Sequence, residues 1–145
     1  MDEWDVLIEA TIDAIHIESA KKEIRIDVTC MWQGRKRMQI VASGVDDFVV
    51  NEMRLSNIID RVTRFGKSGT AEKESETARR LFFMMRGREP NLHDLEWPVL
   101  IEKLAPIRDG KLGLMEIEPV YGATVIVLAQ NFQLESIDDQ YSGLS

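Results

Sequence analysis

A run of alternating residues between positions 23 and 32 constrains the fold more than any other feature of this chain. Every second position from 24 to 32 is apolar, and the positions between them from 23 to 29 are polar: Ile24, Ile26, Val28, Cys30 and Trp32 against Glu23, Arg25, Asp27 and Thr29. Successive side chains of a β-strand point to opposite faces, so this period predicts a strand with one buried face. We therefore expect a sheet built around this segment.

The flanking segments extend this strand into an antiparallel meander over residues 1–51. Alternation over residues 6–12 predicts an earlier strand, and a slip in its phase predicts a β-bulge near Asp13–Ala14. Gln33-Gly34-Arg35 predicts a hairpin turn into the next strand. Ser43-Gly44 predicts another turn, followed by a short strand around Phe48.

The middle of the chain, residues 52–105, is predicted to be mainly helical, with a loop at 66–70. Residues 53–65 suit either a helix or a strand, and their spacing slightly favours a helix. Two later stripes repeat at helical spacing: Ala78, Leu81, Phe82 and Met85, then Trp97, Leu100, Ile101 and Leu104. Asp94 is the expected N-cap of the second helix, and Pro106 its expected end.

Residues 112–132 are predicted to form a C-terminal β-hairpin whose corner is Pro119-Val-Tyr-Gly122, and residues 135–145 a polar tail. The order of strands, then helices, then strands predicts an α+β fold. We expect an antiparallel sheet with two or three helices packed on it, in a single domain over 1–145.

Charge is distributed unevenly along the chain. The net charge is −6 over residues 1–20, +6 over residues 21–88 and −7 over residues 89–145, which gives −7 in total. An acidic face where the two ends meet would attract a basic partner and repel nucleic acid, although an uneven solvated surface would explain the same pattern. The basic stretch 35–88 supports an alternative function, a nucleic-acid-binding module.

Targeting and metal-binding signals are lacking. The acidic start MDEWD does not fit a secretory signal, and no apolar run approaches the ~18 residues of a membrane span. Cys30 is the single cysteine, and His16 and His93 have no ligand at short spacing. We therefore expect a cytoplasmic protein with no membrane association, no cofactor and no metal.

Two short motifs bear on catalysis. Gly66-Lys67-Ser68 is similar to the end of a phosphate-binding loop, but position 61, where that motif needs a glycine, is Arg61. A flexible loop is the favoured interpretation. Glu116 and Glu118 share one strand face, where a glycosidase could hold its acid, but outward-facing solvated carboxylates explain the spacing better. We predict no catalytic residue.

Two stretches resemble segments of a known family. "GVDDFVVNEMRLSNIIDRV" (44–62) and "IEPVYGATVIVLAQNFQLE" (117–135) are similar to parts of small immunity proteins from bacterial polymorphic-toxin systems, including contact-dependent growth inhibition. The resemblance lies in pattern and overall size across most of the chain. It includes no catalytic motif, because such immunity proteins have none.

The resemblance implies a non-enzymatic protein that binds the C-terminal domain of a cognate toxin and covers its active site. Many such toxins are nucleases with basic active-site surfaces, and an RNase is one candidate target. The charge of this chain is consistent with that partner. The acidic ends and two aromatic residues supply the candidate toxin contacts: Asp2, Glu3, Trp4, Asp5, Tyr121, Glu135, Asp138 and Asp139.

Overall fold

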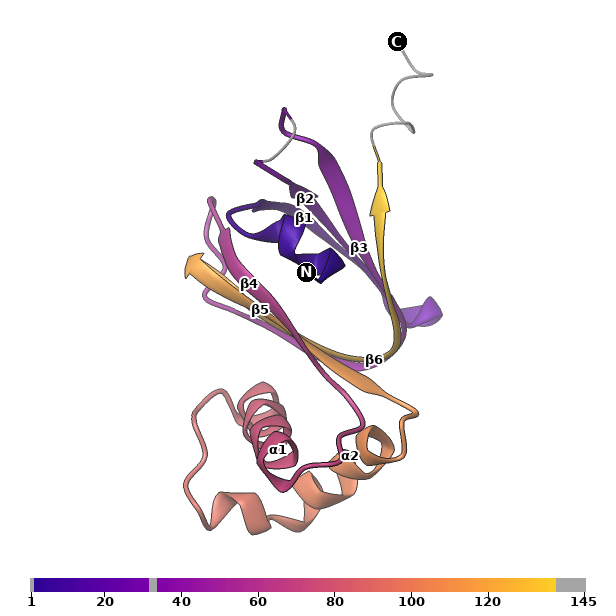
Figure 1. The fold of residues 1–145 in the computed structure, drawn as a ribbon, viewed down its shortest axis with the longest axis vertical. Helices are drawn as coiled ribbons and strands as arrows, with labels where there is room; N and C mark the ends of the chain where they lie inside the picture. Colours follow the sequence, from indigo (N-terminus) through magenta and orange to yellow (C-terminus); the bar gives the residue numbers. More distant parts are fainter. Residues whose placement is uncertain (1, 32–33, 138–145) are drawn as a thin grey trace.

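The computed structural model describes residues 2–31 and 34–137, which form six strands and two α-helices (Figure 1). The strands are β1 (Thr11–Glu18), β2 (Glu23–Thr29), β3 (Arg37–Asn51), β4 (Ile58–Phe65), β5 (Gly113–Tyr121) and β6 (Thr124–Ser136). The helices are α1 (Ala71–Arg86) and α2 (Pro98–Arg108), with three short 3-10 helices: η1 (Glu3–Leu7), η2 (Ser19–Lys21) and η3 (Asp94–Glu96). This arrangement confirms the predicted α+β class.

The strands form an antiparallel sheet that closes on itself in the order β1-β2-β3-β6-β5-β4. β3 and β6 are long and strongly bent, so each takes part in both halves of the sheet (Figure 1). β3 pairs with β2 only as far as Ser43, whereas its pairing with β6 continues to Asn51. Gly44, with φ of +61°, allows β3 to bend directly against the side chain of Gln130.

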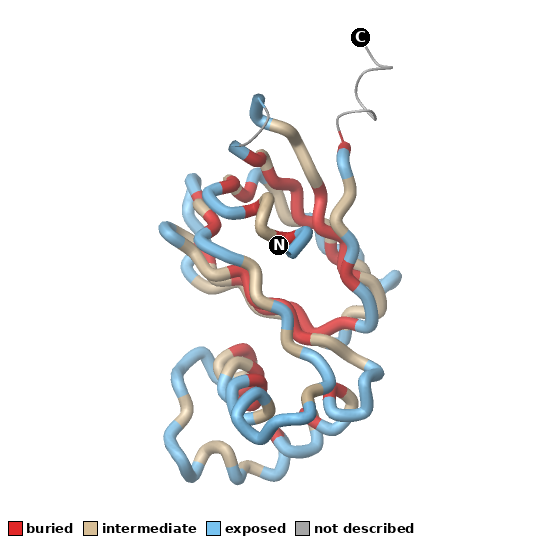
Figure 2. The backbone as a smooth tube through the Cα atoms, viewed as in Figure 1, coloured by how far each residue is buried: buried red, intermediate tan, exposed pale blue. Residues whose placement is uncertain are grey.

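Two hydrophobic clusters hold this arrangement together. One fills the inside of the closed sheet and includes residues from every strand, with Trp4 and Leu7 of η1 added from the N-terminus. The other lies between the outer face of β5 and β6 and the helices, where Leu81 and Phe82 of α1 face Ile126 and Leu128. Figure 2 shows this burial along the strands and on the sides of the helices that face them.

The α1 helix buries Ala78, Leu81 and Phe82 of its predicted stripe, and Met84 is buried where Met85 was expected. Thr70 caps its start by accepting a hydrogen bond from the Lys73 amide at 3.2 Å, and Gly87 ends it with φ of +74°. No helix of the described residues is long and apolar enough to cross a membrane.

The expected bounds of the second helix were wrong at both ends. The helix begins at Pro98, in the favoured first position, and Asp94 instead starts η3. Pro106 lies inside α2 rather than at its end, because the last turn continues past it through a hydrogen bond from the Asp109 amide to the Ala105 carbonyl.

The preference for a helix over residues 53–65 was also wrong, since residues 58–65 form β4. Register shifts between Ile58 and Arg61, where β4 pairs with β5, break the period-2 pattern that would have indicated a strand. The expected turn at Ser43-Gly44 is a bend within the continuous β3. The bulge near Asp13–Ala14 is confirmed by the shift in the β1–β2 register between Ile12 and Ala14.

Candidate functional site

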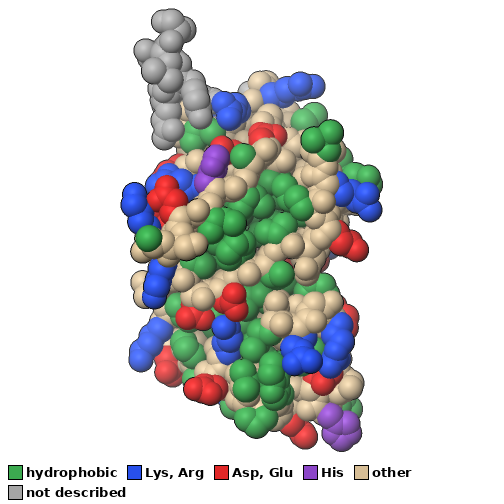
Figure 3. Space-filling model, turned by 180° about the vertical axis from the view of Figure 1, so that it is seen from behind, with side chains coloured by type: hydrophobic (Ala, Val, Ile, Leu, Met, Phe, Trp, Pro, Cys, Tyr) green, Lys and Arg blue, Asp and Glu red, His purple; other side chains and the backbone are tan. Residues whose placement is uncertain are grey.

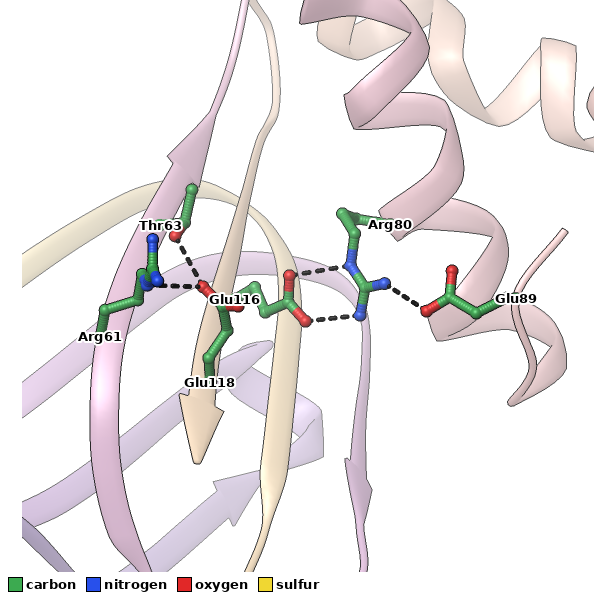
Figure 4. A network of polar contacts seen from close by, with 6 residues as sticks. All are labelled: Arg61, Thr63, Arg80, Glu89, Glu116 and Glu118. Atoms are coloured by element: carbon green, nitrogen blue, oxygen red, sulfur yellow. Dashed lines mark hydrogen bonds and ion pairs between the residues drawn. The ribbon is translucent and has the colours of Figure 1, made fainter. Parts of the chain in front are cut away.

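A cleft of about 570 Å³ lies between α1 and the strands β4 and β5. Five carboxylates and two guanidinium groups line it, from Asp60, Glu76, Glu89, Glu116, Glu118, Arg61 and Arg80. Strand pairing brings β4 and β5 together, and on the outward face of β5 Glu116 reaches toward α1 while Glu118 contacts β4 (Figure 4). The cleft is therefore acidic.

Glu116 and Arg80 form the centre of the cleft. Arg80 Nε donates to Glu116 Oε1 at 2.8 Å, and Arg80 Nη2 donates to Glu116 Oε2 at 2.5 Å. Glu116 is only 4% exposed. The sequence predicted a solvated carboxylate on the outward face of the strand, and for Glu116 that prediction is wrong. Burial raises the pKa of the Glu116 carboxyl, and the guanidinium of Arg80 offsets this only in part.

Around this pair, further polar contacts join three elements. Arg80 Nη1 donates to Glu89 Oε1 at 2.9 Å, and Thr63 Oγ1 of β4 donates to Glu118 Oε2 at 3.1 Å. Arg61 Nε lies 3.5 Å from the same Glu118 oxygen (Figure 4). These contacts fix the carboxylates of β5 between β4 and α1.

The cleft has one feature expected of an acid catalyst, a carboxyl whose pKa is raised. In Glu116, however, both oxygens accept hydrogen bonds from one guanidinium, which is the geometry of a structural ion pair. Such pairs also perturb pKa values without any catalytic role. The chemistry that this cleft offers is the attraction of cationic groups.

An exposed apolar surface, which we call the apolar tip, lies where β5 ends. It consists of Met53, Leu55, Val120 and Tyr121, all of which are exposed. The guanidinium of Arg54 lies 5.3 Å from the centre of the Tyr121 ring, which places the 53–55 loop beside the end of β5. Large apolar side chains exposed on two neighbouring segments make this end of the sheet a candidate protein-binding surface.

The apolar tip is held rigidly by the buried side chain of Asn57. Its Oδ1 accepts hydrogen bonds from the Arg54 amide at 3.0 Å and the Ala123 amide at 2.9 Å, and its Nδ2 donates to the Arg54 carbonyl at 2.7 Å. Gly122 has φ of +91°, and a Cβ there would collide with Asn57. The predicted corner at 119–122 is misplaced, because β5 continues to Tyr121 and the turn falls at Gly122 and Ala123, where it packs against the loop that holds Asn57.

The apolar tip and the acidic cleft lie on adjoining parts of one surface. Pro119, which precedes two residues of the tip, also lines the cleft. On the other side of β4 lies η1, since the Glu9 amide donates to the Ile59 carbonyl at 2.8 Å. The acidic N-terminal segment therefore lies beside β4, where Asp2 and Glu3 are close to Arg64.

The predicted N-terminal contacts lie on η1. Asp2 and Asp5 form a reciprocal capping box at the start of this helix, and Glu3 is exposed beside them. Trp4 is 3% exposed in the interior cluster, and the guanidinium of Arg64 lies 5.6 Å from its ring. Trp4 is therefore a core residue that offers no ring surface to a partner.

The remaining predicted contacts lie far apart along the chain. Tyr121 is 51% exposed in the apolar tip. Glu135 is half-buried on β6, paired in register with Gln39. Asp138 and Asp139 lie outside the described residues.

Sequence reasoning missed the loop residues Met53 and Leu55, and the role of Asp60 at the cleft. These three residues lie in the segment 53–65, which was expected to be helical. Apolar side chains at helical spacing suggest burial, so Met53 and Leu55 were not expected at the surface. A signal was present in the polar residues around them, Asn51, Glu52, Arg54, Ser56 and Asn57, which are typical of a loop.

Several cations of the basic middle are engaged within the fold. Arg64 lies over the rings of Trp4 and Phe132, Arg80 pairs with Glu116, and Arg88 pairs with Asp94 at 2.8 Å. The Gly66-Lys67-Ser68 loop follows β4 and precedes α1, and it lines a separate hollow of about 370 Å³. The nucleic-acid alternative stays a prediction.

Comparison with protein-family descriptions, with curated proteins and with solved structures found no match to this chain. The acidic cleft and the apolar tip are therefore interpreted from their geometry and chemistry alone.

Proposed function

We propose that this chain is a cytoplasmic, non-enzymatic immunity protein that binds a basic toxin domain and covers its active site. The class of toxin that fits this proposal best is a nuclease. The observation that carries the proposal is the rigid apolar tip at the border of the acidic cleft. The resemblance of the sequence to immunity proteins supports the same class.

The apolar tip supplies the part of the surface that would be buried. Leu55 lies on a loop and Tyr121 at the end of β5, and Asn57 fixes the backbone beside both, so little backbone conformational entropy is lost when they are covered. Aromatic residues at the centre of an interface commonly contribute most of its binding energy.

The acidic residues supply attraction and orientation. The cleft has three more carboxylates than guanidinium groups, and the acids of the N-terminal segment lie on the other side of β4. A nuclease binds the phosphates of its substrate with basic side chains. Carboxylates of this chain placed opposite those side chains would occupy the positions of the phosphates. Complementary charge of this kind accelerates association and makes it sensitive to salt.

The proposal is tested with the C-terminal domain of a secreted effector encoded beside this chain's gene. We expect a stable complex and loss of nuclease activity on mixing. Leu55→Asp should weaken inhibition by about a hundredfold or more, because it places a charge at the centre of the interface. The matched control is Leu92→Asp, which changes an equally apolar, exposed residue far from the tip in the loop before η3. The proposal is refuted if the unaltered protein does not inhibit the toxin domain, or if Leu55→Asp and Leu92→Asp inhibit it equally.

A further inference from the structure

The closed sheet is joined only narrowly between β1 and β4. In the described part of the chain, Thr11 and Ile58 are the one pair in register between these strands. Three backbone hydrogen bonds flank this pair, from the Glu9 amide to the Ile59 carbonyl, from the Ile59 amide to the Ala10 carbonyl and from the Ile12 amide to the Asn57 carbonyl, and the strands separate beyond them. On one side η1 fills the opening and inserts Trp4 and Leu7 into the interior cluster (Figure 1).

On the other side the opening is left uncovered by the described residues. Figure 3 shows, on the face opposite η1, an area of hydrophobic side chains framed by strand backbone. Ile15 of β1 and Val45, Phe48 and Val50 of β3 are only partly buried against the interior cluster. Ile17 is 54% exposed.

A cleft of about 310 Å³ crosses one end of this opening. Ile17 and Glu18 of β1 line it on one side, and Val45 to Phe48 of β3 on the other. This places the two strands face to face across the opening, with room between them.

The backbone edges around the opening lack strand partners. From Asp13 to Glu18, β1 pairs with β2 on one edge, and no strand of the described part lies along its other edge. Half of the amide and carbonyl groups of such a strand point away from its partner, and they form a template for a further strand. The edge of β1 therefore favours an extended segment as the occupant.

Charge around the opening favours a basic occupant. The acidic rim of this cleft has four carboxylates, Glu18, Glu23, Asp46 and Asp47, and one basic side chain in its lining, Lys22. Lys21 and Arg25 pair with Glu18 and Glu23 from beside it. Lys103 pairs with both Asp46 and Asp47, at 3.5 and 3.1 Å, so one of these carboxylates is left in excess.

We propose that the free edge of β1 binds an extended segment of a partner protein as an added strand. The apolar side chains of the segment would cover Ile15, Ile17 and Phe48, and its basic side chains would face the acidic rim. Main-chain hydrogen bonds would provide affinity, and the alternating side chains would provide specificity. This inference rests on the proposed function only in assigning the segment to the basic toxin domain.

The test uses the full chain and a short peptide of alternating lysine and valine. Hydrogen–deuterium exchange of the protein is measured with and without this peptide. We expect exchange over residues 13–18 to slow by about tenfold at a peptide concentration near ten times Kd. A peptide of alternating lysine and proline has the same charge but lacks alternate amides, so it should give no protection.

The side-chain contact is tested with Ile17→Lys, because Ile17 is exposed and its replacement leaves the core intact. We expect this variant to bind the lysine–valine peptide about tenfold more weakly. Ile101→Lys is the matched control on α2, where the residue is 45% exposed, and it should bind like the unaltered protein. Unchanged exchange at 13–18, equal protection by both peptides, or equal binding by both variants overturns the inference.

The two proposals fail in different ways. The added strand is refuted, and the immunity function left intact, by two results together. The Ile17→Lys variant inhibits the toxin domain normally, and the lysine–valine peptide does not protect β1 from exchange. Protection of β1 by the lysine–valine peptide, without any inhibition of the toxin domain, refutes the immunity function alone.

Discussion

Arg80 holds Glu116 by both carboxylate oxygens, and this pair joins the middle of α1 to the outer face of β5. Glu116 is almost fully buried, while Arg80 reaches Glu89 near the surface with its remaining nitrogen. The pair therefore fixes the distance between α1 and the sheet, and with it the width of the acidic cleft.

Loss of Arg80 should destabilise the fold more than loss of its outer partner. Arg80→Leu leaves Glu116 buried beside no cation, and we expect the free energy of unfolding to fall by about 2–3 kcal/mol. Glu89→Gln changes an exposed partner and should cost at most about 0.5 kcal/mol. Denaturant unfolding of the two variants measures this difference, and equal losses would show that the pair has no structural role.

The pH dependence of the free energy of unfolding should reveal the stabilising contribution of Asp27. Burial raises the pKa of its carboxyl, but hydrogen bonds from Gln39 at 2.6 Å and His16 at 3.0 Å outweigh burial, so the pKa lies below its ordinary value of 3.8. A lowered pKa means that Asp27 stabilises the fold above this value and that the contribution is lost as pH falls through the folded-state pKa.

We therefore expect Asp27→Asn to lower the free energy of unfolding by about 1–2 kcal/mol at pH 6. The difference from the unaltered protein should shrink as the pH falls below about 3.8. Chemical denaturation at several pH values measures it. A difference that stays constant down to pH ~2 contradicts this account of Asp27.

Gly122 should tolerate no side chain. Its positive φ is strained for any other residue, and a Cβ would collide with Asn57 and lie 2.9 Å from the Ser56 carbonyl oxygen. We expect Gly122→Ala to cost about 2 kcal/mol or more. Gly69→Ala, at a site with open space around it, is the control and should be nearly neutral in thermal unfolding.

The acidic cleft should govern the rate of association more than the lifetime of the complex. Reversing the charges at Asp60 and Glu118 should slow binding of a basic toxin domain by about tenfold at low salt, because exposed charges steer encounter. Stopped-flow kinetics at two salt concentrations test this expectation. Association that is insensitive to both salt and charge reversal would exclude a steering role for the cleft.

The sequence predicted elements well where a single period covers a whole element. The alternation in β2 and the helical stripe of α1 both match the structure, because in each case one face is continuously buried. β4 was misassigned because its pairing with β5 shifts register twice between Ile58 and Arg61. Tertiary pairing there overrides the local spacing.

The candidate site was predictable only in part. Pro119 and Gly122 flank Val120 and Tyr121, and they indicated a corner close to the observed turn, which begins after Tyr121 at Gly122. Nothing local indicates that Asn57 packs beneath this corner or that Arg80 reaches Glu116, because those contacts join segments far apart in the chain. The burial of Trp4 likewise depends on how η1 enters the closed sheet.

The central claim is that the apolar tip binds a basic toxin domain, and calorimetric titration of that domain with Tyr121→Ala tests it most directly. Tyr121 is exposed and belongs to neither hydrophobic cluster, so the variant should fold normally and bind at least about tenfold more weakly than the unaltered protein. Unchanged affinity in a normally folded Tyr121→Ala variant would contradict the claim.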